Sequence, residues 1–166
     1  MNFNVVYDAG VVERFHTCRT TRRQTIGEHS WGVAMVLMHI CDPSVNLLKA
    51  AMLHDVPELV TGDIPAPAKW ACRPLAEALD QFEDDICIGW GIAVELTDDE
   101  HKLLKWADMF ELCLYAKAEV GMGNKYMIGP LTKISHLLVD LPAPTERAFD
   151  LLTDFQLNVY GESSNV

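Results

Sequence analysis

The stretch LKAAMLHDVPELVTGDIPAP, residues 48–67, begins as an apolar helix and then changes character. Four polar side chains follow the apolar ones: His54, Asp55, Glu58 and Asp63. Pro57 lies among them and predicts the end of the helix, because proline lacks an amide hydrogen and clashes with the preceding turn. Neighbouring helical side chains point about 100° apart, so His54 and Asp55 converge only where the chain turns. The stretch therefore predicts a core helix that ends in a cluster of ligands.

The remaining sequence predicts an all-α fold, a helical bundle formed by residues 1–166 as one domain. Residues 29–41 are apolar on nearly all sides, which is typical of a central buried helix. Ser44 predicts the N-cap of a helix over 45–55. Thr97 and Glu100 form a capping-box pattern that predicts a helix of about 20 residues. Further helices are predicted at 74–90, 130–139 and 145–159, with a helical turn and a loop at 57–70. Strand signals are weak.

The charge of the chain excludes a duplex nucleic-acid binder, because such proteins are usually basic. The net charge is −11, from 13 basic and 24 acidic residues. Positive charge is nevertheless concentrated locally, at Arg14, Arg19, Arg22 and Arg23. A small anionic substrate is compatible with this distribution, because attraction depends on the field at the cleft and not on the total charge.

Five cysteines, an odd number with no CxxC pair, indicate reduced thiols and a cytoplasmic location. The N-terminus lacks the basic and apolar regions of a signal peptide. The longest apolar run, 31–41, is too short to span a bilayer. The sequence therefore predicts no membrane partner.

A metal site is predicted from polar residues on otherwise apolar faces. Asp108 lies in the stripe formed by Leu104, Leu112 and Tyr115, and His29 begins the most apolar helix. The alternatives are a surface aspartate and a satisfied helix-start histidine. The predicted ligands are two imidazoles and two carboxylates: His29, His54, Asp55 and Asp108. This donor set suits one divalent ion, with Co, Mn, Zn, Fe and Mg all candidates.

Two further carboxylates are predicted beside the metal. Glu58 lies four residues after His54, where it can act on the proton of a water or of a leaving alkoxide. Its alternative role is to stabilise the first turn of a helix. Asp63 follows Gly62, where it orients substrate or water, or caps a turn.

Three segments together resemble the 5′-deoxynucleotidase group of the HD-domain phosphohydrolase superfamily. They are RFHTCRTTRRQTIGEHS (14–30), HDVPELVTGDIPAPAKW (54–70) and LLKWADMFELCLYAKAE (103–119). The resemblance implies an all-helical, metal-dependent enzyme that cleaves the 5′ phosphoester of deoxynucleotides. It implies ligation by the four residues named above, and Glu58 and Asp63 as catalytic residues.

The same resemblance implies contacts to the substrate. Arg14 would hold phosphate, a role that suits the planar fork of its guanidinium. Phe15 stands where the bacterial members carry a Trp that crowds the sugar, and Lys69 is a second phosphate contact. A separate hypothesis is that Arg19, Arg22 and Arg23 neutralise a longer phosphate chain, and the alternative is that they are solvated surface arginines. Trp31, Trp70 and Ile26 are candidates for the base pocket, together with Phe15.

The chain is shorter than the bacterial nucleotidases and in this is similar to small phage enzymes, some of which are dATP triphosphohydrolases. The favoured function is therefore hydrolysis of dATP to deoxyadenosine and triphosphate, in control of a phage nucleotide pool. The alternatives are a 5′-deoxynucleotidase that releases phosphate from dNMP, and a non-catalytic nucleotide-binding sensor. The group also implies a homo-oligomer. Neither the base preference nor the number of subunits is readable from the sequence.

Overall fold

The computed structural model describes residues 3–160, and its helical architecture confirms the predicted all-α class. The helices are α1 (Phe3–Ala9), α2 (Ile26–Ile40), α3 (Val45–Leu53), α4 (Glu58–Thr61), α5 (Ala66–Ala71), α6 (Arg73–Trp90), α7 (Asp98–Gly121), α8 (Ile128–Asp140) and α9 (Glu146–Tyr160), with a 3-10 turn η1 (Lys125–Met127). Two short antiparallel strands, β1 (Glu13–Arg14) and β2 (Gln24–Thr25), bring Arg14 opposite Gln24.

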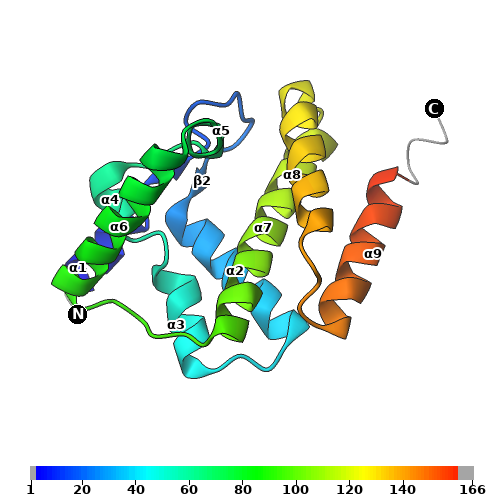
Figure 1. The fold of residues 1–166 in the computed structure, drawn as a ribbon. Helices are drawn as coiled ribbons and strands as arrows, with labels where there is room; N and C mark the ends of the chain where they lie inside the picture. Colours follow the sequence, from blue (N-terminus) through cyan, green and yellow to red (C-terminus); the bar gives the residue numbers. More distant parts are fainter. Residues whose placement is uncertain (1–2, 161–166) are drawn as a thin grey trace.

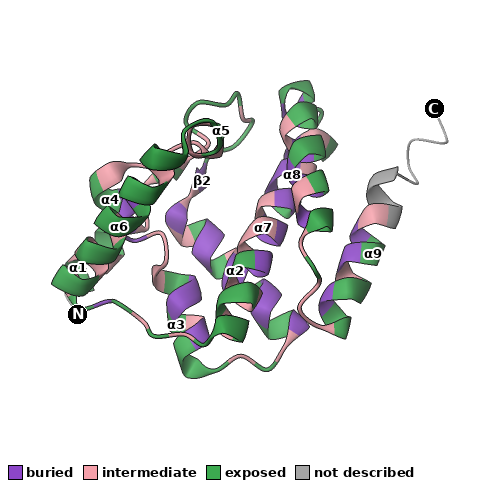
Figure 2. Cartoon of the chain, viewed as in Figure 1, coloured by how far each residue is buried: buried purple, intermediate pink, exposed green. Residues whose placement is uncertain are grey.

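The other helices are arranged around a central pair, α2 and α7 (Figure 1). In the figure α1, α4, α5 and α6 lie on one side of this pair, and α8 and α9 lie on the other. Buried residues concentrate on α2, α3 and α7, whereas most of α6 is exposed (Figure 2). No helix within residues 3–160 combines the length and the apolar content that crossing a bilayer requires.

The main core is aromatic at its centre. Trp106 stacks on Phe110 with ring centroids 5.0 Å apart, and Phe110 meets Phe155 of α9 edge-on at 5.5 Å. Both arrangements are favoured by the ring quadrupoles. A smaller cluster, Ala9, Val56 and Ile92, ties α1 to the turn after α3 and to the segment after α6. These contacts fix the turn that carries the predicted ligands.

The starts of α2, α3 and α7 follow the capping rules. Ser44 accepts a hydrogen bond from the backbone of Leu47, and Thr97 forms the predicted capping box with Glu100. The predicted start of α2 at residue 29 was late, because Thr25 and Glu28 form a second capping box that begins the helix at Ile26. As a result, His29 lies inside a complete first turn and not at a frayed end.

A buried carboxylate fastens the loop that follows β1 to the end of α7. Glu119 is fully buried and accepts hydrogen bonds from the backbone amides of Thr21 (2.7 Å) and Arg22 (3.1 Å). The side chains of Thr21 and Asn124 also donate to it, at 2.9 and 2.7 Å. Burial alone would raise the pKa of Glu119, but these donors stabilise the ionised carboxylate and hold the pKa below its ordinary value of 4.5.

Replacement of this carboxylate, Glu119→Gln, is expected to lower the free energy of unfolding by about 2 kcal/mol at neutral pH, the scale of hydrogen bonds to a charged group. A lowered pKa contributes stability that is complete above about pH 4.5 and lost as the pH falls through the folded-state value. The difference between wild type and variant should therefore shrink on acidification. Urea unfolding at neutral pH and at about pH 4 measures this difference in the free energy of unfolding. An equal difference at the two pH values would contradict the role of an ionised Glu119.

Candidate metal centre and substrate cavity

His29 occupies the point where α2 crosses α7, and its side chain is fully buried. Its Nε2 atom lies 3.1 Å from Oδ1 of Asp108 and 3.6 Å from Oδ2 of Asp55. A buried imidazole between two carboxylates is costly unless the group carries or contacts positive charge. The position is therefore built for a cation.

His54 and Asp55 lie in the turn between α3 and α4. His54 is the C-cap of α3, and its Nδ1 atom lies 2.9 Å from the carbonyl oxygen of Ala51. Its Nε2 atom lies 3.4 Å from Oδ1 of Asp55. Pro57 ends this turn as the N-cap of α4. The proline thus stops one helix and begins the next, which brings His54 and Asp55 to the same place.

The donor atoms of His29, His54 and Asp55 all lie within 4.8 Å of one another. Both Nε2 atoms are buried, and neither has a hydrogen-bond partner within residues 3–160. Buried polar atoms are normally satisfied, so two unsatisfied imidazole nitrogens beside a carboxylate fit a divalent ion. The fourth predicted ligand, Asp108, lies beside this group through its contact with His29.

Electrostatics at the centre also favour positive charge. Burial disfavours a charged imidazolium, yet the nearby carboxylates of Asp108 and Glu111 outweigh it and raise the pKa of His29 to about 9. Burial likewise acts against an ionised Asp108, but His29 holds the pKa of that carboxyl well below its usual range. A proton on His29 and a metal ion beside it would satisfy the same field.

Arg14 and Glu58 border the centre. The guanidinium of Arg14 forms an ion pair with Asp55, and its Nε is buried without a hydrogen-bond partner in the described chain. Glu58 is the first residue of α4 and only 5% exposed. Burial, reinforced by the charge of Asp55, raises the pKa of Glu58 to about 9. Its carboxyl group is therefore protonated at neutral pH in the metal-free protein.

Phe15 adopts a backbone conformation that is uncommon for a residue other than glycine, with φ of 56°. Its amide donates a hydrogen bond to Oδ2 of Asp63 at 2.9 Å, and its ring stacks on Tyr115 at 4.8 Å. Such a conformation persists only where the surroundings enforce it, and it is concentrated at functional sites. Asp63 therefore holds Phe15 at the edge of the site.

A cavity of about 390 Å³ opens from the metal centre between α5, α7 and α8. It is lined by seven of the predicted site residues: Arg14, Phe15, Asp55, Glu58, Asp63, Lys69 and Asp108. It is also lined by two lysines that the sequence did not single out, Lys105 and Lys133, and by Trp70. Lys133 places its ammonium 4.0 Å from the centre of the Trp70 ring, which joins α8 to α5 across the cavity.

The other arginines point elsewhere. Arg19 lies over the Tyr126 ring at 4.9 Å, Arg22 pairs with Glu28 at 3.2 Å, and exposed Arg23 pairs with Glu13. None of the three lines the cavity of about 390 Å³ within the described residues. Of the base-pocket candidates, Phe15 and Trp70 line the cavity, whereas Ile26 is buried and Trp31 is 63% exposed.

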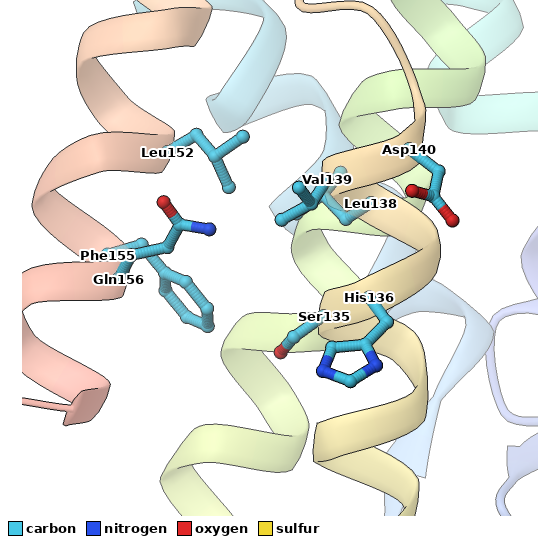
Figure 3. Close-up of a pocket in the computed structure, with 8 residues that line it drawn as sticks. All are labelled: Ser135, His136, Leu138, Val139, Asp140, Leu152, Phe155 and Gln156. Atoms are coloured by element: carbon cyan, nitrogen blue, oxygen red, sulfur yellow. The ribbon is translucent and has the colours of Figure 1, made fainter.

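A second cavity, of about 380 Å³, lies between α8 and α9 (Figure 3). Its lining includes His136, Asp140 and Gln156 among apolar side chains, as the figure shows. No arginine, lysine or second histidine lines it in the described chain. It therefore lacks the groups that phosphate chemistry requires.

Sequence reasoning missed Glu111, which lies one turn after Asp108 on α7 and contacts the other ring nitrogen of His29. The available signal was its spacing, since residues three apart share a helix face. Lys105 lies three residues before Asp108 and carries the same signal. No such spacing signal pointed to Lys133, because this residue lies on a different helix, α8.

Two solved structures of HD-domain phosphohydrolases share this helical fold. The HD-domain phosphohydrolase from Listeria innocua superposes with a TM-score of 0.75 at 19% identity, over 98% of this chain and 90% of its own. The cyanophage S-2L HD phosphohydrolase DatZ, bound to dA and one catalytic Zn²⁺ ion, gives 0.68 at 21% identity, over 96% of each chain.

Residues 2–87 match the model of the family described as 5′-deoxynucleotidase YfbR-like. A 5′-deoxynucleotidase of Cronobacter sakazakii is 30% identical over 142 residues, which cover 69% of this chain and 70% of the relative. A dATP triphosphohydrolase of Salmonella phage PMBT28 is 36% identical over 90 residues, which span 46% of each chain, less than half of that enzyme. The chain belongs to the YfbR-like family of HD phosphohydrolases and is an enzyme of that class.

Proposed function

We propose that this enzyme binds one divalent metal ion and hydrolyses the 5′ phosphoester of deoxynucleotides, with dATP as the favoured substrate. The products would be deoxyadenosine and triphosphate. The observation that carries the proposal is the cavity of about 390 Å³, which is lined by the candidate ligands Asp55 and Asp108 together with Glu58 and Arg14. Its volume is within the range of small-molecule sites.

The charge of the cavity lining supports a triphosphate. Besides Arg14, three lysines line it: Lys69, Lys105 and Lys133. A single phosphate carries about two negative charges, which Arg14 and a metal ion would already neutralise. The further lysines match a longer phosphate chain, and they take the role that the sequence assigned to Arg19 and its neighbours. The phage relative is also named as a dATP triphosphohydrolase.

His29, His54 and Asp55, with Asp108 beside them, would hold the metal ion. When bound, a divalent ion supplies Lewis-acid activation of water and of a phosphoryl oxygen. Zinc is one candidate, since the cyanophage structure contains it. Cobalt, manganese and iron also suit mixed nitrogen and oxygen donors, and magnesium suits them less well.

The chain's own residues would then orient the phosphate and manage the proton. Arg14 would hold the α-phosphate beside the metal centre, where its fixed fork stabilises the charge of the transferring group. The oxygen of water joins the α-phosphorus and the water releases a proton, while the bond from phosphorus to the 5′ oxygen breaks. Glu58 would carry a proton to that leaving oxygen, and the proton released by the attacking water would restore its carboxyl group. Phe15, held by Asp63, would face the sugar.

The alternative within the same chemistry is a 5′-deoxynucleotidase, and the longer match to the Cronobacter enzyme favours it. A substrate panel separates the two. Metal-loaded protein is incubated with the four dNMPs, the four dNTPs and ATP, and the products are separated by chromatography and phosphorus NMR. Triphosphate from dATP supports the proposal, and orthophosphate from several dNMPs supports the alternative. No product with any metal would refute both enzyme activities and favour the nucleotide-binding sensor.

The predicted homo-oligomer is a separate prediction, and light scattering measures the number of subunits in solution.

Lys133→Ala is expected to raise KM for dATP about tenfold while changing kcat little, because one charge-assisted contact to phosphate contributes roughly 1.5 kcal/mol. Arg23→Ala is the matched control, since Arg23 is exposed and pairs with Glu13 outside the cavity. Steady-state kinetics on dATP measure both. An equal effect of the two substitutions would show that the cavity lysine has no special role.

A further inference from the structure

Glu111 is a buried acid on α7 that the proposed reaction does not use. It is 8% exposed, and its Oε2 atom forms a short hydrogen bond with Nδ1 of His29. An ionised carboxylate only accepts hydrogen bonds, so Nδ1 of His29 must carry the proton that is shared between them. In the neutral form of the imidazole, the form that ligates a metal ion, the lone pair is then on Nε2, the atom that faces Asp55 and Asp108.

Two neighbours hold Glu111 in place. Gln24 of β2, only 1% exposed, donates from Nε2 to the other carboxylate oxygen at 2.8 Å. Gly32 lies one turn after His29 on α2, and a Cβ atom there would come 2.7 Å from Cγ of Glu111. Because real Cβ atoms essentially never approach so closely, the glycine provides the space that the glutamate side chain occupies.

The two metal-centre histidines are thus oriented by different means. Nδ1 of His54 contacts a backbone carbonyl of its own helix, that of Ala51. His29 depends on a carboxylate from a different helix, 82 residues away in the sequence. A carboxylate behind a ligating histidine fixes its tautomer and increases its basicity, and loss of such a group typically weakens metal binding 10- to 100-fold.

We propose that Glu111 is a positioning residue that fixes His29 in the form that ligates through Nε2, and that Gln24 and Gly32 keep Glu111 in place for this role. The inference rests on the proposed metal site. It extends that site to three residues that neither touch the metal nor line the substrate cavity of about 390 Å³.

Metal affinity tests the proposal without any need for turnover. Metal-free wild type, Glu111→Gln and Gly32→Ala are titrated with Zn²⁺ by calorimetry and with Co²⁺ by visible absorption, which reports the ligands of the ion. Glu111→Gln keeps the shape but loses the charge. Gly32→Ala removes no polar atom and instead displaces Glu111. Both substitutions are expected to raise the dissociation constant for the metal ion at least tenfold and to change the cobalt spectrum.

Matched controls separate this role from general damage to the fold. Glu119→Gln makes the same change at another buried glutamate of α7, and Gly89→Ala adds a Cβ to α6 where nothing lies within 4 Å. Both should bind Zn²⁺ and Co²⁺ as wild type does. If Glu111→Gln fails to fold, Gly32→Ala still decides the question.

Two outcomes would overturn the inference, and they are distinguishable. Wild-type affinity and an unchanged cobalt spectrum in both Glu111→Gln and Gly32→Ala would refute the positioning role and leave the metal site intact. Absence of Zn²⁺ and Co²⁺ binding by wild type would refute the metal site itself, and the positioning role with it.

Discussion

Glu58→Gln is expected to slow hydrolysis of dATP by about a thousandfold, within the range that general acid–base catalysis contributes. The side chain is only 5% exposed, and its Oε2 atom has no hydrogen-bond partner among the described residues. In the metal-free protein, burial and the charge of Asp55 raise the pKa of this carboxyl group to about 9. A glutamine has almost the same shape but cannot transfer a proton to the leaving 5′ oxygen.

Single-turnover kinetics with metal-loaded protein measure this effect, and calorimetry with Zn²⁺ shows whether metal binding is retained. Glu83→Gln is the matched control. Burial also raises the pKa of Glu83, but this residue lies on α6 and outside the substrate cavity. A Glu58→Gln variant with more than a tenth of wild-type activity would exclude Glu58 as the proton donor. A variant that binds dATP with wild-type affinity but does not turn it over would support an enzyme and not a sensor.

Much of the fold was predictable because its helix boundaries depend on local rules. Ser44 and Thr97 cap the helices that they were expected to cap. The late prediction for α2 was avoidable, since Thr25 and Glu28 obey the same capping-box rule. The short helix α1 and the paired residues of β1 and β2 were not predicted. A strand of two residues has no periodicity that a sequence pattern could reveal.

The candidate site was predictable where spacing along one segment determines it. His54 and Asp55 converge because a turn at Pro57 follows a helix, which is visible in the sequence. The sequence did not reveal whether the side chains of Arg19 and Arg22 point toward the cavity. Arg19 and Arg22 lie outside the cavity because their loop is fastened by Glu119, which is 98 residues from Thr21 in the sequence. Such long-range partners follow from tertiary packing and not from local pattern.

Removal of one carboxylate, Asp108→Asn, is expected to weaken binding of a divalent ion by about a hundredfold or more and to abolish activity at ordinary metal concentrations. His29 Nε2 lies 3.1 Å from this carboxylate, so an ion bound to that nitrogen would lie beside it. The structure brings His29, His54 and Asp55 within 4.8 Å of one another, with Asp108 adjacent. The Asp108→Asn substitution therefore tests whether the ion has three protein ligands or four.

Thermal unfolding with and without metal distinguishes three protein ligands from four. An ion that binds only the folded state stabilises it by about 2.7 kcal/mol at a hundred times its dissociation constant. Wild type should therefore gain several degrees in Tm on addition of Zn²⁺ or Mn²⁺, and lose them again with a chelator. Asp108→Asn should show almost no gain at the same metal concentration. Its control is Asp99→Asn, the same change on the same helix at an exposed residue that pairs with Lys102.

The Tm gain on metal addition is the quantity to compare, because the metal-free proteins differ for another reason. Without an ion, Asp108 neutralises a protonated His29, and burial makes the loss of either partner costly. Asp108→Asn should therefore have a lower Tm than wild type even before metal is added. If the variant nevertheless gains as much from Zn²⁺ as wild type does, then His29, His54 and Asp55 are sufficient ligands. Asp108 would then serve only to balance the charge of His29.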